Sequence, residues 1–197
     1  MDPTDIAAKQ LARMRGMTRY YHERFFADVR WAGGLMVALF VAGWSFADEA
    51  FLVIPFVALW GATQTAFDAS YLIFARQYAA RLERYLNSRL GTDVLIAAEL
   101  EDAYLFPLGK PKIVTAAFGK GFSWFGFMTL FTTALGLVGF GYGLVLGMPE
   151  LPNSWRPAYL GVLFTLTLVA LLVGTWWFVT GVGERRLEDV LDRTFPS

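Results

Sequence analysis

Few residues in this sequence are equipped for chemistry. His22 is the single histidine, and the chain has no cysteine. One histidine cannot build a multi-histidine metal site, and cysteine-ligated clusters are excluded. The stretch YYHERF places His22 among aromatic residues, which favours packing at a membrane surface over ligand binding. No phosphate-binding or dinucleotide-binding glycine motif is present. The sequence therefore predicts neither an enzyme nor a metal or cofactor site.

Asp68 is the one ionisable residue inside an otherwise apolar stretch. Gln64 and Thr65 precede it at helical spacing, so the three polar side chains are predicted to share one helix face. An acid at membrane depth is by default a functional-site hypothesis. Three interpretations stay open: an ion path, a polar contact with another subunit, or pairing of Asp68 with cytoplasmic water or with a base such as Arg76.

The stretch VGFGYG at 138–143 looks at first like the selectivity filter of a potassium channel. Such a filter is a loop that supplies backbone carbonyls and normally opens with threonine. Leu137 occupies the threonine position here. Small residues instead recur at steps of three and four, which predicts a ridge for close packing on one helix face. The ridge consists of Thr132, Gly136, Gly139, Gly143 and Gly147.

Helices that cross a membrane must position these residues, because the composition does not suit a water-soluble core. Apolar residues make up 56% and charged residues 17% of the 197 residues, against about 45–50% and about 25% in soluble domains. A helix needs about 20 mostly apolar residues to cross the hydrocarbon. Four segments lack any Asp, Glu, Lys or Arg: 31–47, 51–67, 122–148 and 157–183. The predicted fold class is therefore all-α, a polytopic membrane protein with four transmembrane helices in two hairpins, plus amphipathic cytoplasmic helices.

The basic residues predict the orientation. Of the 17 Lys and Arg residues, all except Arg156 fall on one side of the four spans. By the positive-inside rule both termini and the central segment are cytoplasmic, and the protein lies in the cell (inner) membrane. The predicted segments are an interfacial amphipathic helix at 1–30, the first hairpin at 31–75, a cytoplasmic helical segment at 76–120, the second hairpin at 121–182 and a tail helix at 183–197.

The helix after the second span carries a seven-residue repeat. Tyr71, Tyr78 and Tyr85 lie seven apart, and Leu82 lies at a four-residue offset. This pattern predicts a seam that resembles one side of a coiled coil. A contact within the monomer and a contact between copies both explain the seam.

Helix ends can also be read from the sequence. Asp2 is expected to cap a helix that starts at Pro3. Gly91 is expected to end the long helix of the second span, and Thr92 or Asp93 to cap the next helix, DVLIAAELEDAYLF.

The acids of that next helix lie near the bases of the preceding one. We expect Glu99, Glu101 and Asp102 to pair with those bases at an exposed surface, where ion pairs contribute little stability. The stretch FPLGKPK at 106–112 is expected to return the chain to the membrane.

Abundant packing signals beside little chemistry predict a non-catalytic structural or accessory subunit of a membrane protein assembly. The alternative is a homo-oligomeric ion channel or small transporter that uses the stripe of Gln64, Thr65 and Asp68. A toxic membrane effector is a third hypothesis. The expected partners are membrane lipids and other membrane protein subunits or copies of the chain. The net charge is zero, so nothing favours nucleic acid. The aromatic content of 17% fits bound lipid and leaves pigment contact open.

Overall fold

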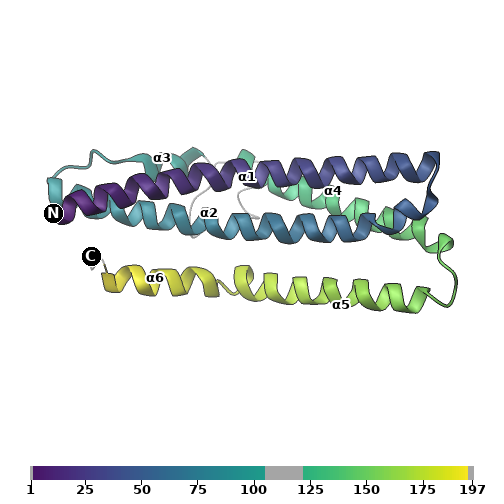
Figure 1. Cartoon of the computed structure of the whole chain (residues 1–197). Coiled ribbons are helices and arrows are strands. Elements are labelled where there is room, and N and C mark those ends of the chain that lie inside the picture. The colour runs from purple at the N-terminus through teal and green to yellow at the C-terminus, as the bar shows by residue number, and fades with distance from the viewer. Residues whose placement is uncertain (1, 105–121, 195–197) are drawn as a thin grey trace. The chain divides into compact units, whose positions relative to one another are not determined.

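The structure is a computed structural model that describes residues 2–104 and 122–194 (Figure 1). These residues form helices and contain no strand, as the all-α prediction requires. In chain order the elements are α1 (Pro3–Ser45), the 3₁₀ turn η1 (Asp48–Leu52), α2 (Ile54–Leu90), α3 (Ala97–Tyr104), α4 (Trp124–Gly147), the 3₁₀ turn η3 (Met148–Glu150), α5 (Arg156–Gly174), the π-helical turn η4 (Thr175–Val179) and α6 (Val182–Thr194).

Four helical stretches within the described residues are long and apolar enough to cross a membrane. They are Pro3–Ser45, Asp48–Leu90, Trp124–Glu150 and Arg156–Thr194. The structure thus supports the prediction of a multi-pass membrane protein. The first two stretches are longer than a bilayer requires, since about 20 residues cross the hydrocarbon. Each continues without interruption through the segment boundary that the sequence predicts at residue 30 or 75.

The chain divides into two compact units. Unit 1 holds the described residues of Met1–Arg24, Asp68–Leu130 and Val182–Ser197, and unit 2 holds Phe25–Phe67 and Phe131–Gly181. This division follows polarity, because only six of the 17 basic and 17 acidic residues lie in unit 2. These six are Asp28, Arg30, Asp48, Glu49, Glu150 and Arg156.

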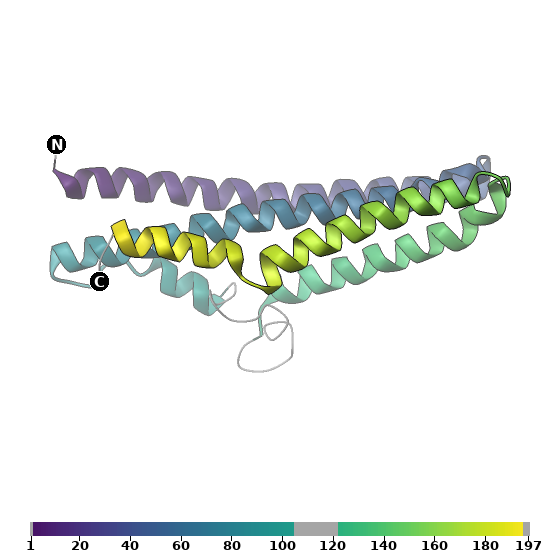
Figure 2. The same cartoon turned by 90° about the horizontal axis from the view of Figure 1, so that it is seen from below.

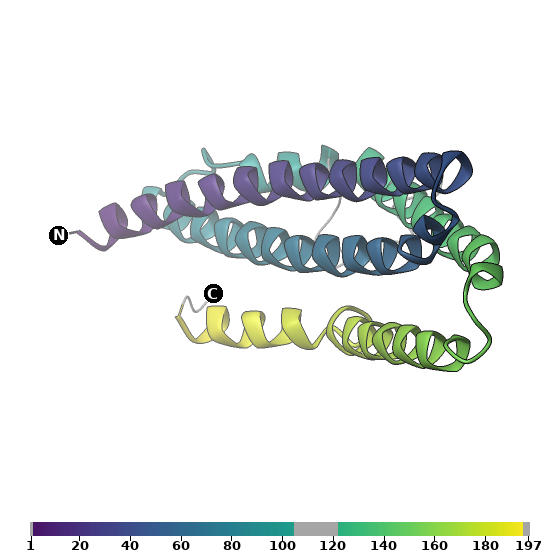
Figure 3. The same cartoon turned by 45° about the vertical axis from the view of Figure 1, so that its right-hand side comes forward.

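In unit 1 the first half of α1 lies beside the second half of α2 (Figures 1 and 3). An apolar cluster joins them, with Ala7 and Met14 from α1 and Ala79, Leu82 and Leu86 from α2. Full burial of a Met or Leu side chain stabilises a fold by about 1.5–3 kcal/mol. The cluster therefore fixes how the two helices face one another within unit 1.

The tail helix α6 also belongs to unit 1 and contacts α2 (Figure 2). Leu191 is its buried residue, and Asp192 pairs with Arg81 of α2. The pair is largely exposed on the Asp192 side, so it contributes less than the burial of Leu191. The prediction of a short tail helix is confirmed.

In unit 2 the helices approach one another closely at glycine positions. A Cβ on Gly61 of α2 would lie 2.7 Å from the Cβ of Ala32 of α1. That separation is too short for two carbon atoms, so glycine is required for this packing. Tyr159 of α5 is tied to the turn before α2, because its hydroxyl donates a 2.9 Å hydrogen bond to the Leu52 carbonyl.

The predicted helix ends are confirmed at two places. The Thr4 N–H donates a 3.1 Å hydrogen bond to the Asp2 carboxylate at the start of α1. Gly91 has φ of +67° and follows the last residue of α2, and the Thr92 N–H then donates to the Asn87 carbonyl at 3.3 Å. This is a Schellman ending, which favours glycine because it requires a left-handed residue.

The start of α3 differs from the prediction. The helix begins at Ala97 rather than beside Thr92 or Asp93. Asn87 of α2 bonds both the N–H and the carbonyl of Leu95, at 3.0 and 2.9 Å, and holds this segment outside the helix. The two hydrogen bonds from Asn87 of the preceding helix therefore outweigh the local capping signal. The stretch FPLGKPK lies outside the described residues.

Candidate functional site

Asp68, the acid of the predicted polar stripe, is fully buried within unit 1. Its Oδ1 lies 3.4 Å from Nε of Arg24, whose side chain is 42% exposed. Beside this pair the ring of Tyr21 stacks on that of Tyr71, with centroids 4.8 Å apart. The sequence suggested Arg76 as a partner, but Arg76 lies two turns further along α2, about 12 Å away along the helix.

The other two residues of the stripe belong to unit 2. The Thr65 hydroxyl donates to the Gly61 carbonyl at 2.9 Å, a bond within its own helix. Gln64 is half-buried. The hydroxyl of Thr65 is thus satisfied by the backbone of α2, as is common for threonine in helices.

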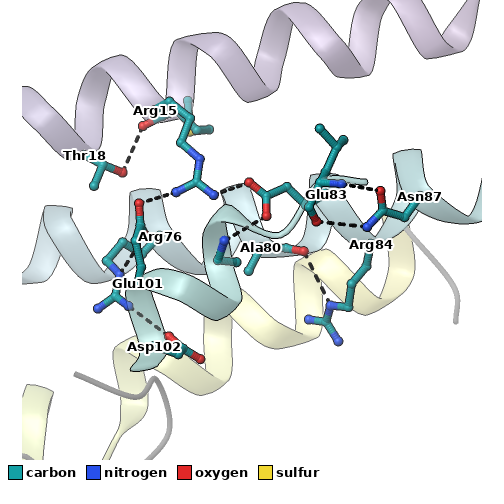
Figure 4. Close-up of polar contacts among 12 residues, drawn as sticks. Arg15, Thr18, Arg76, Ala80, Glu83, Arg84, Asn87, Glu101 and Asp102 are labelled. Atoms are coloured by element: carbon teal, nitrogen blue, oxygen red, sulfur yellow. Dashed lines mark hydrogen bonds and ion pairs between the residues drawn. The ribbon is translucent and has the colours of Figure 1, made fainter. Parts of the chain in front are cut away.

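Arg76 instead belongs to a network of charges that joins α1, α2 and α3 (Figure 4). Its Nε donates to Glu101 at 3.2 Å and its Nη2 to Asp102 at 2.9 Å. Arg15 of α1 donates to Glu101 and to Glu83 of α2. Glu101 therefore bridges two arginines that come from different helices.

Burial sets the energetics of this network. Arg76 is 1% exposed and Glu83 is 3% exposed. The predicted pairing of Glu101 and Asp102 with a base of the preceding helix is confirmed. The expected exposure is wrong for the base Arg76, whereas the Asp102 side chain is 41% exposed. A buried arginine needs several charge-assisted hydrogen bonds to offset its desolvation. Removal of one partner of this network should therefore strongly destabilise the fold, whereas removal of a surface pair should not.

Glu83 has a second role at the start of α3. Its Oε2 accepts the N–H of Ala98 at 2.9 Å, while its Oε1 accepts from Arg15. The first N–H groups of a helix have no partner within the helix, and a carboxylate satisfies them well. Glu83 thus places α3 where Glu101 reaches the two arginines.

The predicted seam packs within the chain, against α1. Leu82 lies in the apolar cluster of unit 1, and Tyr78 and Tyr85 pack against that cluster from its edge. The Tyr78 hydroxyl donates a 2.8 Å hydrogen bond to Gln10. Tyr71 stacks on Tyr21 of α1.

The predicted ridge of small residues lies on α4 and packs inside unit 2 over its second half. A Cβ on Gly143 would lie 2.9 Å from the Ile54 Cβ, and one on Gly147 would lie 2.9 Å from the Leu52 backbone nitrogen. A Cβ on Gly139 would lie 3.2 Å from the sulfur of Met36. Gly136 faces open space, and Thr132 is half-buried.

A pocket of about 260 Å³ lies within unit 1. It is lined by Arg15, Thr18, Arg19 and His22 of α1, Leu72 of α2, Glu101 of α3 and Phe125 of α4. The His22 ring stacks on that of Phe125, with centroids 5.9 Å apart and an interplanar angle of 29°. In the part of the chain that the structure describes, no group of three or more His, Asp or Glu residues is arranged to hold a metal ion.

Sequence reasoning missed the pocket and the role of Glu83. The four pocket residues of α1 recur at steps of three, one and three, so a shared helix face was visible in the sequence. Arg76 and Glu83 lie seven apart, and Glu83 directly follows the seam position Leu82. Residues at that spacing lie at the edge of a buried helix face, and this pattern could have identified Arg76 and Glu83 from the sequence.

Comparison of the chain with protein-family models, with curated proteins and with solved structures gives no match.

Proposed function

We propose that this chain is a non-catalytic membrane protein that serves as a structural or accessory subunit of a membrane protein assembly. The burial of Asp68 beside Arg24 is the observation that carries this proposal. A carboxylate that lines an ion path must face water, whereas this one is enclosed and paired with a guanidinium. In this proposal Asp68 therefore serves packing rather than transport.

The helix α5 offers one apolar surface for assembly. Leu163 is its buried residue, while side chains on its other faces are exposed, including Phe164 at 68% and Leu171 at 62%. Gly143 and Gly147 of the ridge already contact the chain's own residues. A partner helix, from another protein or from a second copy, thus packs on α5, and lipid covers the rest.

Cysteine cross-linking in native membranes tests this surface, because the chain contains no cysteine of its own. Phe164→Cys and Leu171→Cys variants should form adducts with a neighbouring protein or with a second copy. Leu163→Cys, buried on the same helix, is the matched control and should form none. Absence of adducts at both exposed positions, together with a monomeric particle after gentle extraction, would contradict the proposal.

Ion flux through reconstituted vesicles separates this function from the channel alternative. We expect no flux that depends on Asp68, so wild type and Asp68→Asn should leak equally. A cation flux in wild type that Asp68→Asn abolishes would establish the stripe of Gln64, Thr65 and Asp68 as a path and overturn the accessory role.

The same proposal places both termini and the central segment in the cytoplasm, with the protein in the cell (inner) membrane. The excess of basic residues on that side supports it. Ser88 and Ser154 are both exposed and lie on opposite sides in this topology. In intact cells a membrane-impermeant maleimide should label Ser154→Cys and spare Ser88→Cys. Labelling of Ser88→Cys alone would reverse the orientation.

A further inference from the structure

The helix α3 turns its charged face inward and its apolar face outward. The inner face holds Glu101 and Asp102, which bond arginines of α1 and α2. The outward face consists of exposed residues at steps of three, one, three and one, which is one side of a helix. These residues are Ile96, Glu99, Leu100, Ala103 and Tyr104. Leu100 is 59% exposed and Tyr104 is 83% exposed. A helix on a water-facing surface has the opposite arrangement, so we expect this apolar face to be covered.

Lipid does not reach the outward face of α3. The helix runs antiparallel to α2, because the segment before it bonds Asn87 and its last turn bonds Arg76. Arg76 and Asn87 lie about 12 and 28 Å past Asp68 along α2, at about 1.5 Å per residue. Asp68 directly follows the charge-free segment 51–67. Headgroups extend a bilayer by only about 5–8 Å on each side of the hydrocarbon. The face therefore lies in the aqueous phase, where a protein and not a lipid can cover it.

The outward face of α3 is acidic. Glu99 lies at its middle and takes part in no ion pair among the described residues, and no base lies three or four positions from it. In a symmetric contact of α3 with the α3 of a second copy, the two Glu99 side chains would face one another. Like charges that meet in an interface are unfavourable. The surface that complements this face is therefore a basic one.

The outer face of α1 has the complementary charge. Arg13 is exposed and takes part in no ion pair among the described residues, and no acid lies three or four positions from it. Lys9 lies one turn earlier and is also exposed. Ala12 and Gly16 lie beside them, and a Cβ on Gly16 would meet nothing within 4 Å. These small residues leave room for a large apolar side chain such as Leu100.

The two faces lie at the same level above the bilayer. Copies of a membrane protein share one orientation, so a contact between them joins residues at one level. Both α1 and α3 run antiparallel to α2. Arg15 of α1 bonds Glu101 of α3 (Figure 4). Arg13 and Glu99 each lie two positions before these bonded residues, so they share a level as well.

We infer that a second copy of this chain docks on α3 through the outer face of its own α1, with Glu99 of one copy beside Arg13 of the next. Each copy then binds one neighbour through α3 and another through α1. Such a contact closes into a ring or extends as a row of copies. The inference rests on the proposed function, an assembly of membrane protein subunits, and it uses a surface separate from α5.

Disulfide cross-linking of two differently tagged chains in native membranes tests this contact, because the chain has no cysteine. When Glu99→Cys and Arg13→Cys are placed in separate chains and co-expressed, mild oxidation should link the two tags. Ser88→Cys, at an exposed position of α2, replaces Arg13→Cys as the control and should give no link. Glu99→Cys expressed alone should also give none.

Charge exchange gives a second readout, the co-purification of two tagged copies of the full-length chain in mild detergent. Glu99→Arg should lower co-purification at least about tenfold, because it places like charges opposite one another. Addition of Arg13→Glu to the same chain should restore it. Leu100→Ser should also lower co-purification, whereas Val190→Ser, at 57% exposure on α6, is the matched control and should not.

Three results would overturn the inference. They are absence of the mixed link, a link of Glu99→Cys to itself in its place, and failure of Arg13→Glu to restore the Glu99→Arg variant. Adducts at Phe164→Cys or Leu171→Cys of α5 without the mixed link would exclude this contact and leave the proposed function standing.

Discussion

Replacing Glu83 with alanine should destabilise unit 1 more than removal of any surface charge. Breaking a buried ion pair costs about 3–5 kcal/mol, and the lower end applies because Arg15 is 23% exposed and keeps Glu101. Loss of the acceptor for the Ala98 N–H adds about 1 kcal/mol. The total is about 4 kcal/mol, which corresponds to roughly 8–16 °C in melting temperature for a chain of this size.

The assay combines two measurements on protein purified in detergent. Thermal unfolding by circular dichroism gives the global effect, and hydrogen exchange of peptides from 97–104 reports whether α3 has lost its start. Glu83→Gln keeps an acceptor for the Ala98 N–H, so it should destabilise less than alanine and protect α3 better. Glu23→Ala removes an acid that pairs with exposed Arg19 and should leave the melting temperature unchanged.

Two results would refute this reasoning. If Glu83→Ala melted like Glu23→Ala, the carboxylate would be hydrated rather than buried between helices. If Glu83→Gln and Glu83→Ala changed exchange of α3 equally, the bond to Ala98 would have no part in positioning that helix.

Three further predictions concern backbone positions and the second ion pair. Gly143→Ala should destabilise the protein by about 1–3 kcal/mol through overpacking, whereas Gly136→Ala, which faces open space, should be neutral or stabilising; comparable melting of the two variants would count against the packing of α4. Gly91→Ala should cost about 1–2 kcal/mol because its φ is positive, and Gly91→Asn should cost less in the same unfolding experiment. Arg24→Ala should lower the melting temperature more than Arg24→Ala combined with Asp68→Asn, since the single variant leaves a buried carboxylate without its arginine; an additive double variant would exclude the pair.

Features that depend on local sequence were predictable. The spans follow from runs without charge, and the ends of helices at Asp2 and Gly91 follow from the chemistry of single residues. The capping signals act within about one helical turn, and each charge-free run lies within a single predicted span, so no knowledge of the neighbouring helices is required.

The partners of the buried charges were not predictable from local pattern. Successive residues of a helix point about 100° apart, so a small rotation of α1 would exchange the residues that face α2. The apolar cluster around Met14 and Leu82 sets that rotation. It brings Arg15 to Glu83 and Arg24 to Asp68, across 68 and 44 positions of sequence. The delayed start of α3 has the same origin, because Asn87 and Glu83 act on it from α2.

The ion pairs of unit 1 also impose a rule of parity on the route of the chain. Two charged side chains can meet only on one side of a bilayer, so the chain between them must cross it an even number of times. Arg15 meets Glu83 and Arg81 meets Asp192. Two charge-free segments separate the members of each pair, 31–47 and 51–67 for the first pair and 122–148 and 157–183 for the second. If one of the two spans between the members of an ion pair failed to insert, the pair could form only if the other span also failed to insert. Failed insertion of one span alone should leave an arginine and a carboxylate on opposite sides of the membrane. The two spans between paired residues should accordingly fail to insert together.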